Sequence, residues 1–217
     1  RMRSCNICRL AVDELDSGEK KQLDRWFRDQ VRPVLSPLVV DLHHPFPHLP
    51  NKRLSLALSL RQNGKESFGL IPVPPALPPF LRLEERGLRY ILLEDILSHY
   101  ADEIFDQFDI TARAVIAVTR NADISPEDEA YEIDEDFRQH MCKIIKKRSR
   151  LAPVRLEVQG DKGDKMIPFL CEKLELAPEQ VFHSRVPLSL QYVYQLEGLL
   201  PPESKAALCS PPYAPRF

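Results

Sequence analysis

The chain has 217 residues, of which 43% are hydrophobic and 29% are charged, a composition that argues against disorder or a coiled coil over its whole length. Thirty Lys and Arg residues nearly balance thirty-two Asp and Glu residues, so any site that binds a polyanion must be local. The five cysteines are mostly far apart, which argues against a disulfide framework and favours a reducing, cytoplasmic setting. No apolar run approaches the roughly 20 residues of a transmembrane helix.

The glycine content argues against several classes of enzyme. Only seven glycines accompany twenty prolines, and the sequence contains no G-x-G-x-x-G, G-x-x-x-x-G-K-[ST] or G-x-S-x-G motif. Dinucleotide-binding, P-loop and α/β-hydrolase chemistry therefore lack the backbone loops that they need. Composition points away from a self-contained enzyme.

The N-terminal region predicts a strand followed by a helix. Residues 5–12 are short and apolar enough for a strand. Residues 13–17 supply helix-capping residues, and Glu19 lies in the first turn of a helix predicted over residues 18–32. Pro33 ends this helix because it lacks an N–H and clashes with the preceding turn.

A β-hairpin is predicted next. Residues 53–60 alternate apolar and small polar side chains, residues 62–65 have turn composition, and residues 67–73 form a second apolar run. The prolines between residues 33 and 79 exclude long helices from this region.

The rest of the chain mixes strands and helices. The longest helix is expected to begin at Ser125-Pro126, with Phe137 in the middle of its apolar stripe. The other predictions are strands over residues 88–93, 111–119, 154–158 and 181–183, and helices over residues 94–105, 164–175 and 188–199.

This mixture predicts an α+β fold, a single domain with a mixed, partly antiparallel sheet packed by helices. We expect the domain to cover residues 1–200. Residues 201–217 are rich in proline and are predicted to be a linker without regular structure, in a polypeptide that continues beyond it.

Two patterns of Cys and His residues invite a functional interpretation. Cys5 and Cys8, with His43, His44 and His48, could supply four zinc ligands. Because residues three apart on a strand point to opposite faces, half-buried thiols are favoured over a metal site. The histidines could also serve as general acids or bases, but no nucleophile with a paired carboxylate can be assigned to them by spacing. A rigid structural loop that packs Phe46 inward is therefore favoured.

The charges around the predicted long helix are strongly segregated. Residues 123–136 are acidic and residues 138–150 are basic, so the first could hold calcium and the run from Lys146 to Arg150 could bind a polyanion. The acidic segment lacks the order of an EF-hand loop, and acids at the start of a helix with bases at its end match the helix dipole. Solvated helix ends explain most of the pattern.

Arg120 and Asn121 follow the buried strand predicted over residues 111–119. A side chain in this position can be held rigidly toward a ligand, and the arginine fork can bind phosphate oxygens. In the alternative, Asn121 and Asp123 accept backbone hydrogen bonds in a turn and Arg120 pairs with a carboxylate. The sequence favours neither interpretation over the other.

Six ordered motifs of the chain resemble the bacterial polyphosphate kinase family. They are PVLSPLVVD at 33–41, HPFPxLxN at 44–51, VPPxLP at 73–78, VTRNAD at 118–123, VRLEV at 154–158 and PYAPRF at 212–217. Two positions depart from the family: His48 stands where an aromatic residue is usual, and Pro79 stands where Arg often precedes Phe80.

The resemblance implies the middle, or head, domain of such an enzyme, between a helical N-terminal domain and two phospholipase D-like catalytic domains. It implies reversible transfer of the terminal phosphate of ATP to polyphosphate through a phosphohistidine, with ATP and Mg²⁺ bound outside this chain. It also implies that the head domain contributes to a homo-oligomer and to one wall of the polyphosphate path.

His43, His44 and His48 match no phosphohistidine position of the family. The chain alone is therefore expected to be inactive, with no catalytic, cofactor-binding or metal-binding residue and no nucleic-acid partner. Its partners would be the other domains of the same polypeptide. Arg120 and Asn121 are the candidates for contact with polyphosphate. The alternatives are an independent polyanion-binding module that uses Lys146 to Arg150, and a zinc or thiol module.

Overall fold

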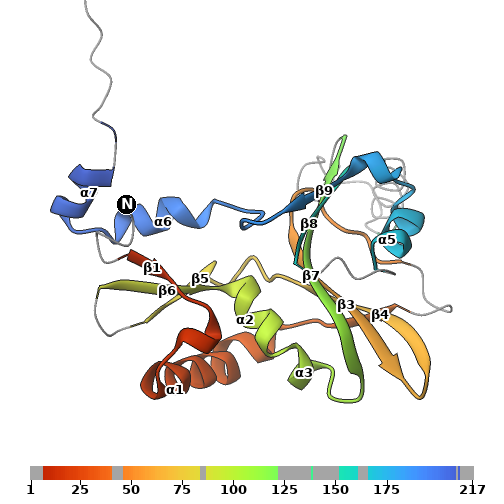
Figure 1. Ribbon diagram of the computed structural model, residues 1–217, viewed down its shortest axis with the longest axis horizontal. Helices are drawn as coiled ribbons and strands as arrows, with labels where there is room; N and C mark the ends of the chain where they lie inside the picture. Colours follow the sequence, from red (N-terminus) through yellow and green to blue (C-terminus); the bar gives the residue numbers. More distant parts are fainter. Residues whose placement is uncertain are drawn as a thin grey trace, which may run out of the picture. The chain divides into compact units, whose positions relative to one another are not determined.

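The computed structural model describes residues 7–40, 46–83, 87–121, 138, 152–160, 166–208 and 210. The chain divides into two compact units, one formed by residues 1–35, 74–101 and 189–217 and the other by residues 36–73 and 102–188. Each unit contains helices and a sheet with both parallel and antiparallel pairs (Figure 1). The predicted α+β class is therefore confirmed. Within the described ranges, no helix is long and apolar enough to cross a membrane.

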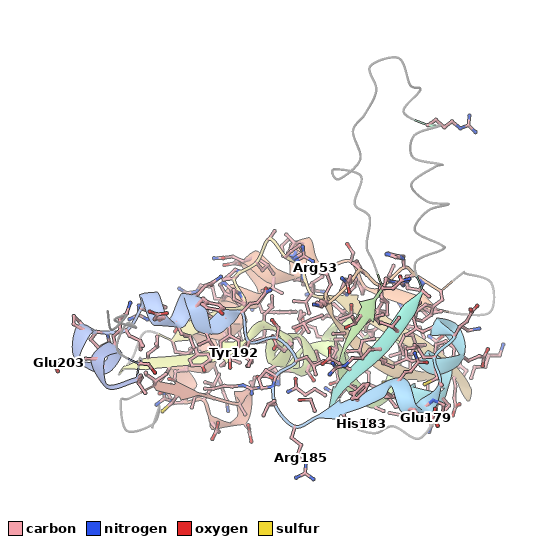
Figure 2. The ribbon with its side chains drawn as sticks, turned by 90° about the horizontal axis from the view of Figure 1, so that it is seen from above. Arg53, Glu179, His183, Arg185, Tyr192 and Glu203 are labelled. Carbon is pink, nitrogen blue, oxygen red and sulfur yellow. The ribbon has the colours of Figure 1, made fainter. Side chains whose placement is uncertain are left out.

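The unit that contains the N-terminal helix has a three-stranded sheet in the order β1-β6-β5. Its elements are β1 (Ile7–Arg9), α1 (Ser17–Trp26), β5 (Phe80–Leu83), β6 (Leu88–Leu92), α2 (Leu93–His99), α6 (Tyr192–Gly198) and α7 (Pro202–Leu208). β1 pairs with β6 in parallel, and β5 pairs with β6 antiparallel. Tyr192 of α6 packs into the same apolar cluster as Tyr90 of β6, with ring centroids 5.9 Å apart (Figure 2).

Helix α1 begins with the predicted cap. The Asp16 carboxylate accepts hydrogen bonds from the N–H groups of Gly18 and Glu19, and the Glu19 carboxylate accepts one from the Asp16 N–H. These reciprocal bonds satisfy N–H groups that have no partner inside the helix. The chain then continues through a π-helical turn, Phe27–Val31, into a 3₁₀ turn that contains Pro33. The helix predicted over residues 18–32 is therefore α-helical only as far as Trp26, and Pro33 lies within a helical turn rather than after it.

Glu94 is a buried carboxyl group near the start of α2. Only 4% of the residue is exposed, and burial raises the pKa of the Glu94 carboxyl from its ordinary value of 4.5 to about 7. The Asp95 carboxylate adds to this rise, whereas the Glu94 backbone N–H and the Arg9 guanidinium lower the pKa. Arg9 is itself paired with Asp95, with 2.8 Å between Nη2 and Oδ2. Desolvation therefore dominates.

Glu94→Gln is expected to raise the free energy of unfolding at pH 8 by up to about 3 kcal/mol, because the variant no longer buries a carboxylate. A folded-state pKa above the unfolded one means that stability falls as the pH rises from 4.5 to about 7. The two proteins should therefore be nearly equal at pH 4. Denaturant titrations at both pH values test this, with Glu179→Gln at an exposed position as the control (Figure 2). Equal stabilities at pH 8 would contradict the prediction.

The second unit has a six-stranded sheet in the order β2-β4-β3-β7-β8-β9. Its elements are β2 (Leu38–Val40), β3 (Leu54–Gln62), β4 (Lys65–Pro72), β7 (Asp109–Arg120), β8 (Pro153–Gly160), α5 (Met166–Leu174) and β9 (Val181–Ser184). All neighbouring strands are antiparallel except β8 and β9, which are parallel. A parallel pair needs a crossover connection, and α5 lies in the segment between these two strands (Figure 1).

The predicted hairpin is confirmed as β3 and β4, which pair from Ser55–Pro72 to Gln62–Lys65. Asn63 and Gly64 form the turn with φ values of 50° and 76°. In a two-residue hairpin, the turn with positive φ at both residues matches the twist of the two strands that it joins. An Asn-Gly pair adopts these angles readily.

The core of this unit lies between one face of the sheet and α5 (Figure 1). Met166, Leu170 and Leu174 of α5 are buried with Leu156 and Val158 of β8 in the same cluster. Their spacing along α5 is i, i+4, i+8, so one face of the helix covers the sheet.

Some predicted elements differ from the structure. The helix predicted over residues 94–105 is divided at Tyr100 into α2 and α3 (Ala101–Ile104). The Tyr100 ring stacks on Phe27 with centroids 3.8 Å apart, and its hydroxyl donates to Asp24.

Other differences concern the short elements and the C-terminal region. Strands β2 and β5 were not predicted. Residues 201–217 were predicted to have no regular structure, and this is wrong for Pro202–Leu208, which form α7. Of the helix predicted to begin at Ser125, the structure describes only Arg138, which is helical, and Phe137 lies outside the described residues.

Candidate functional site at the end of strand β7

Arg120 is the last residue of β7, a strand that is paired on both sides. β3 lies along one edge and β8 along the other, and the five residues from Ala114 to Val118 are all buried. Such a strand cannot shift without breaking two ladders of hydrogen bonds. The direction in which the chain leaves it is therefore set by the sheet.

The pairing with β8 becomes irregular at Arg120. Thr119 is opposite Arg155, but Arg120 is opposite Pro153, with a register shift between Thr119 and Arg120. Pro153 has no N–H, so it cannot donate a ladder hydrogen bond to β7 at this position. An irregularity of this kind re-aims the side chain at the end of a strand.

A segment that is distant in the sequence runs beside this strand end. The Lys52 N–H donates to the Val118 carbonyl at 2.7 Å, and Asn51 forms an isolated parallel bridge with Val118. The Arg120 N–H donates to Asn51 Oδ1 at 3.0 Å, and Arg120 Nε donates to the Leu49 carbonyl at 2.9 Å. Arg120 is thus held at both its backbone and its side chain.

Apolar contacts fix this segment to the core. Leu49 is 3% exposed, and the Phe46 ring packs against Phe68 and Phe169, with centroid distances of 6.1 and 6.2 Å. The prediction that the proline-rich loop packs Phe46 inward is therefore confirmed. Lys52 has a φ of 56°, a left-handed conformation that turns the chain into β3.

The two predicted site residues have different surroundings. Arg120 is half-buried, whereas Asn121 is exposed and its N–H donates to the Ala152 carbonyl at 3.3 Å. A planar guanidinium fixed through Nε presents its terminal N–H groups in one direction, as recognition of phosphate oxygens requires. Contact of Arg120 or Asn121 with a phosphate stays a prediction.

Of the other residues singled out from the sequence, the structure describes His48 and Cys8, which belong to different units. His48 is exposed in the loop beside Arg120, and Cys8 is half-buried on β1 in the other unit. Cys5, His43, His44 and residues 146–150 lie outside the described residues. Among the described residues, no three His, Cys, Asp or Glu side chains gather as a metal site would require. The absence of zinc stays a prediction.

Comparison with known proteins identifies the family. A family model described as the polyphosphate kinase middle domain matches residues 18–196. The chain belongs to this family. The polyphosphate kinase of Mycolicibacterium gilvum is 32% identical over 209 residues, covering 93% of this chain and 28% of that protein. That of Campylobacter jejuni strain 81-176 is 33% identical over 207 residues, covering 94% of this chain and 29% of that protein.

A solved structure supports the fold of this middle domain. The crystal structure of polyphosphate kinase from Porphyromonas gingivalis matches with a TM-score of 0.73 at 21% identity, over 100% of this chain and 30% of that chain. The chain therefore spans under a third of the length of these relatives. Both segments that meet at the end of β7 lie within the range matched by the family model.

Asn51 and Leu49 are the site residues that sequence reasoning missed. Asn51 belongs to one of the motifs that resemble the family, and Arg120 belongs to another. The motifs alone do not show that these residues touch, because 69 residues separate them.

Proposed function

We propose that the chain is the non-catalytic middle domain of a polyphosphate kinase, which transfers the terminal phosphate of ATP to polyphosphate reversibly through a phosphohistidine. The observation that carries this proposal is the match of residues 18–196 to the middle-domain family. In this proposal ATP, Mg²⁺ and the phosphohistidine belong to other domains of a longer, homo-oligomeric, cytoplasmic enzyme. The lack of a glycine-rich phosphate loop in the sequence supports a non-catalytic role.

Within that enzyme, Arg120 contacts the phosphates of the polyphosphate chain. With thirty Lys and Arg residues against thirty-two Asp and Glu residues, the overall field of the domain does not attract a polyanion, so attraction must come from particular side chains. Arg120 is suited to this because its Nε is already held by the Leu49 carbonyl. Little further ordering is then needed when its fork meets phosphate oxygens.

Arg120→Ala in the polyphosphate kinase that contains this chain is expected to lower the affinity for inorganic polyphosphate about tenfold, through loss of a charge-assisted hydrogen bond. Binding titrations at several salt concentrations should also give a shallower salt dependence, because one cationic contact is lost. Arg120→Lys keeps the charge but not the planar fork, and should be intermediate.

The control is Arg185→Ala, which removes the same charge from an exposed arginine that projects from the chain after β9 (Figure 2). It should leave polyphosphate affinity unchanged. The rival is the basic run over residues 146–150, tested by a triple alanine variant of Lys146, Lys147 and Arg148. All variants are checked for folding by circular dichroism. If the triple variant loses affinity and Arg120→Ala does not, the Arg120 contact is wrong and an independent polyanion-binding module is favoured.

A further inference from the structure

Arg120 is held by one short segment at two points. Asn51 Oδ1 accepts from its backbone N–H at 3.0 Å, and the Leu49 carbonyl accepts from its Nε at 2.9 Å. Only Pro50 separates the two residues that provide these acceptors. The pair therefore acts as a clamp, and we call residues 49–51 the clamp segment.

The clamp segment is itself anchored at both ends. At its first residue, Leu49 is 3% exposed within the cluster that includes Phe68. After it, the Lys52 N–H donates to the Val118 carbonyl at 2.7 Å. The position of the Asn51 amide is thus set by the core and by β7 together, so that the amide is pre-organised as an acceptor.

The hydrogen bond from Arg120 to Asn51 lies where the sheet stops supporting the strand. The last residue pair of β3 with β7 is Leu54–Ala117, so β3 offers no strand partner to Arg120 on the side of β7 where the Lys52 N–H donates to the Val118 carbonyl. The Asn51 side chain supplies the acceptor for the Arg120 N–H at this place. The φ and ψ angles of Arg120, and with them the direction of its side chain, depend on this bond.

We propose that Asn51 is a positioning residue that directs the Arg120 guanidinium toward the phosphates of a linear polyphosphate. This inference rests on the proposed function, in which Arg120 meets polyphosphate. Asn51 acts through Arg120, because its side-chain oxygen bonds the backbone of that residue. The Leu49 carbonyl then fixes the plane of the guanidinium, and the remaining N–H groups of the fork meet the anion.

A positioning role and a purely structural role predict different effects of the Asn51 side chain on polyphosphate affinity. Its effect on stability is the same in both cases, because the bond uses the backbone N–H of residue 120. That N–H persists when Arg120 is replaced by alanine. Loss of the Asn51 side chain should therefore destabilise the protein equally whether residue 120 is Arg or Ala. Its effect on polyphosphate affinity should disappear when there is no guanidinium to direct.

The experiment is a double-mutant cycle in the polyphosphate kinase that contains this chain, with Asn51→Ala, Arg120→Ala and the double variant. Affinity for inorganic polyphosphate of defined length and thermal stability are both measured. We expect Asn51→Ala to lower affinity about three- to tenfold, which corresponds to the cost of ordering one long side chain. In the Arg120→Ala background, Asn51→Ala should leave polyphosphate affinity unchanged. It should still destabilise the protein, by the same amount as it does when Arg120 is present. Asn51→Ser, which is shorter but keeps a hydroxyl, provides a second variant if Asn51→Ala does not fold.

Gln180→Ala is the matched control. The Gln180 side-chain amide also holds backbone of the same unit, accepting from the Ala177 N–H at 2.8 Å and donating to the Val154 carbonyl at 3.0 Å. Its loss should reduce stability without reducing polyphosphate affinity.

Three outcomes would overturn the inference. If Asn51→Ala weakens binding equally in both backgrounds, or no more than Gln180→Ala does, its role is structural only. If Arg120→Ala weakens binding but Asn51→Ala does not, the positioning role is wrong and the proposed contact of Arg120 stands. If Arg120→Ala leaves affinity unchanged, both that contact and the positioning role are wrong.

Discussion

Replacing Arg89 by methionine is expected to lower the free energy of unfolding at pH 7 by about 3 to 5 kcal/mol, because it leaves a buried carboxylate without its counter-ion. Arg89 pairs with Glu19 through two contacts, 2.9 Å from Nε to Oε1 and 3.0 Å from Nη2 to Oε2. Glu19 is only 2% exposed. The carboxylate is therefore shielded from water in the folded protein, and the guanidinium is the cation that compensates its charge. Denaturant titration of the 217-residue chain measures the loss.

Two further variants show whether the loss in Arg89→Met comes from the uncompensated Glu19 carboxylate or only from the lost contact between the two side chains. In the double variant Glu19→Gln/Arg89→Met the carboxylate is gone, so much of the stability should return. Arg113→Met breaks a pair with Asp102, whose side chain is 65% exposed, and it should cost less than about 1 kcal/mol. If Arg89→Met lowers the free energy of unfolding by as little as Arg113→Met does, then Arg89 does not compensate the burial of the Glu19 carboxylate.

The sequence predicted the local parts of the fold because their causes are local. The bonds between Asp16 and Glu19 span three residues, and the turn at Asn63 and Gly64 depends on the φ values that these two residues adopt readily. A run of Ala, Val and Ile residues likewise located β7, whose five residues from Ala114 to Val118 are all buried. The buried residues of α5 follow the spacing of one helix face. Elements of this kind can be predicted from the residues that form them.

Other features depend on distant partners. The division of the helix at Tyr100 is associated with contacts to Phe27 and Asp24, which lie more than 70 residues away. Glu94 looks like a favourable acid in the first turn of a helix, yet tertiary packing leaves it 4% exposed. Nothing in the pattern near these residues indicates which surfaces will cover them.

The candidate site shows the same division. Arg120 could be predicted as a rigidly placed side chain because it follows a buried strand. The clamp by Asn51 and Leu49 could not, because hydrogen bonds across 69 and 71 residues leave no periodic trace. Two motifs that the sequence presents separately therefore form one structure at the end of β7.

The aromatic cluster that anchors the clamp segment gives the second large effect. Phe68→Ala is expected to lower the free energy of unfolding by about 3 to 5 kcal/mol, because truncation loses burial and leaves a cavity. Phe68 is 5% exposed on β4, and its ring lies 5.0 Å from Phe169 and 6.1 Å from Phe46. Denaturant titration of the 217-residue chain measures this loss.

Phe182→Ala in the same unit is the matched control, because the Phe182 side chain on β9 is 47% exposed. Its one described aromatic contact is with the Arg155 guanidinium, 4.4 Å from the ring centroid, so the loss should stay below about 1 kcal/mol. Equal losses at the two positions would contradict the placement of Phe68 in the core.

Because Phe46 lies three residues before Leu49, loosening its contact with Phe68 should also free the clamp segment. Phe68→Ala should therefore reduce polyphosphate affinity when Arg120 is present and leave it unchanged in the Arg120→Ala background.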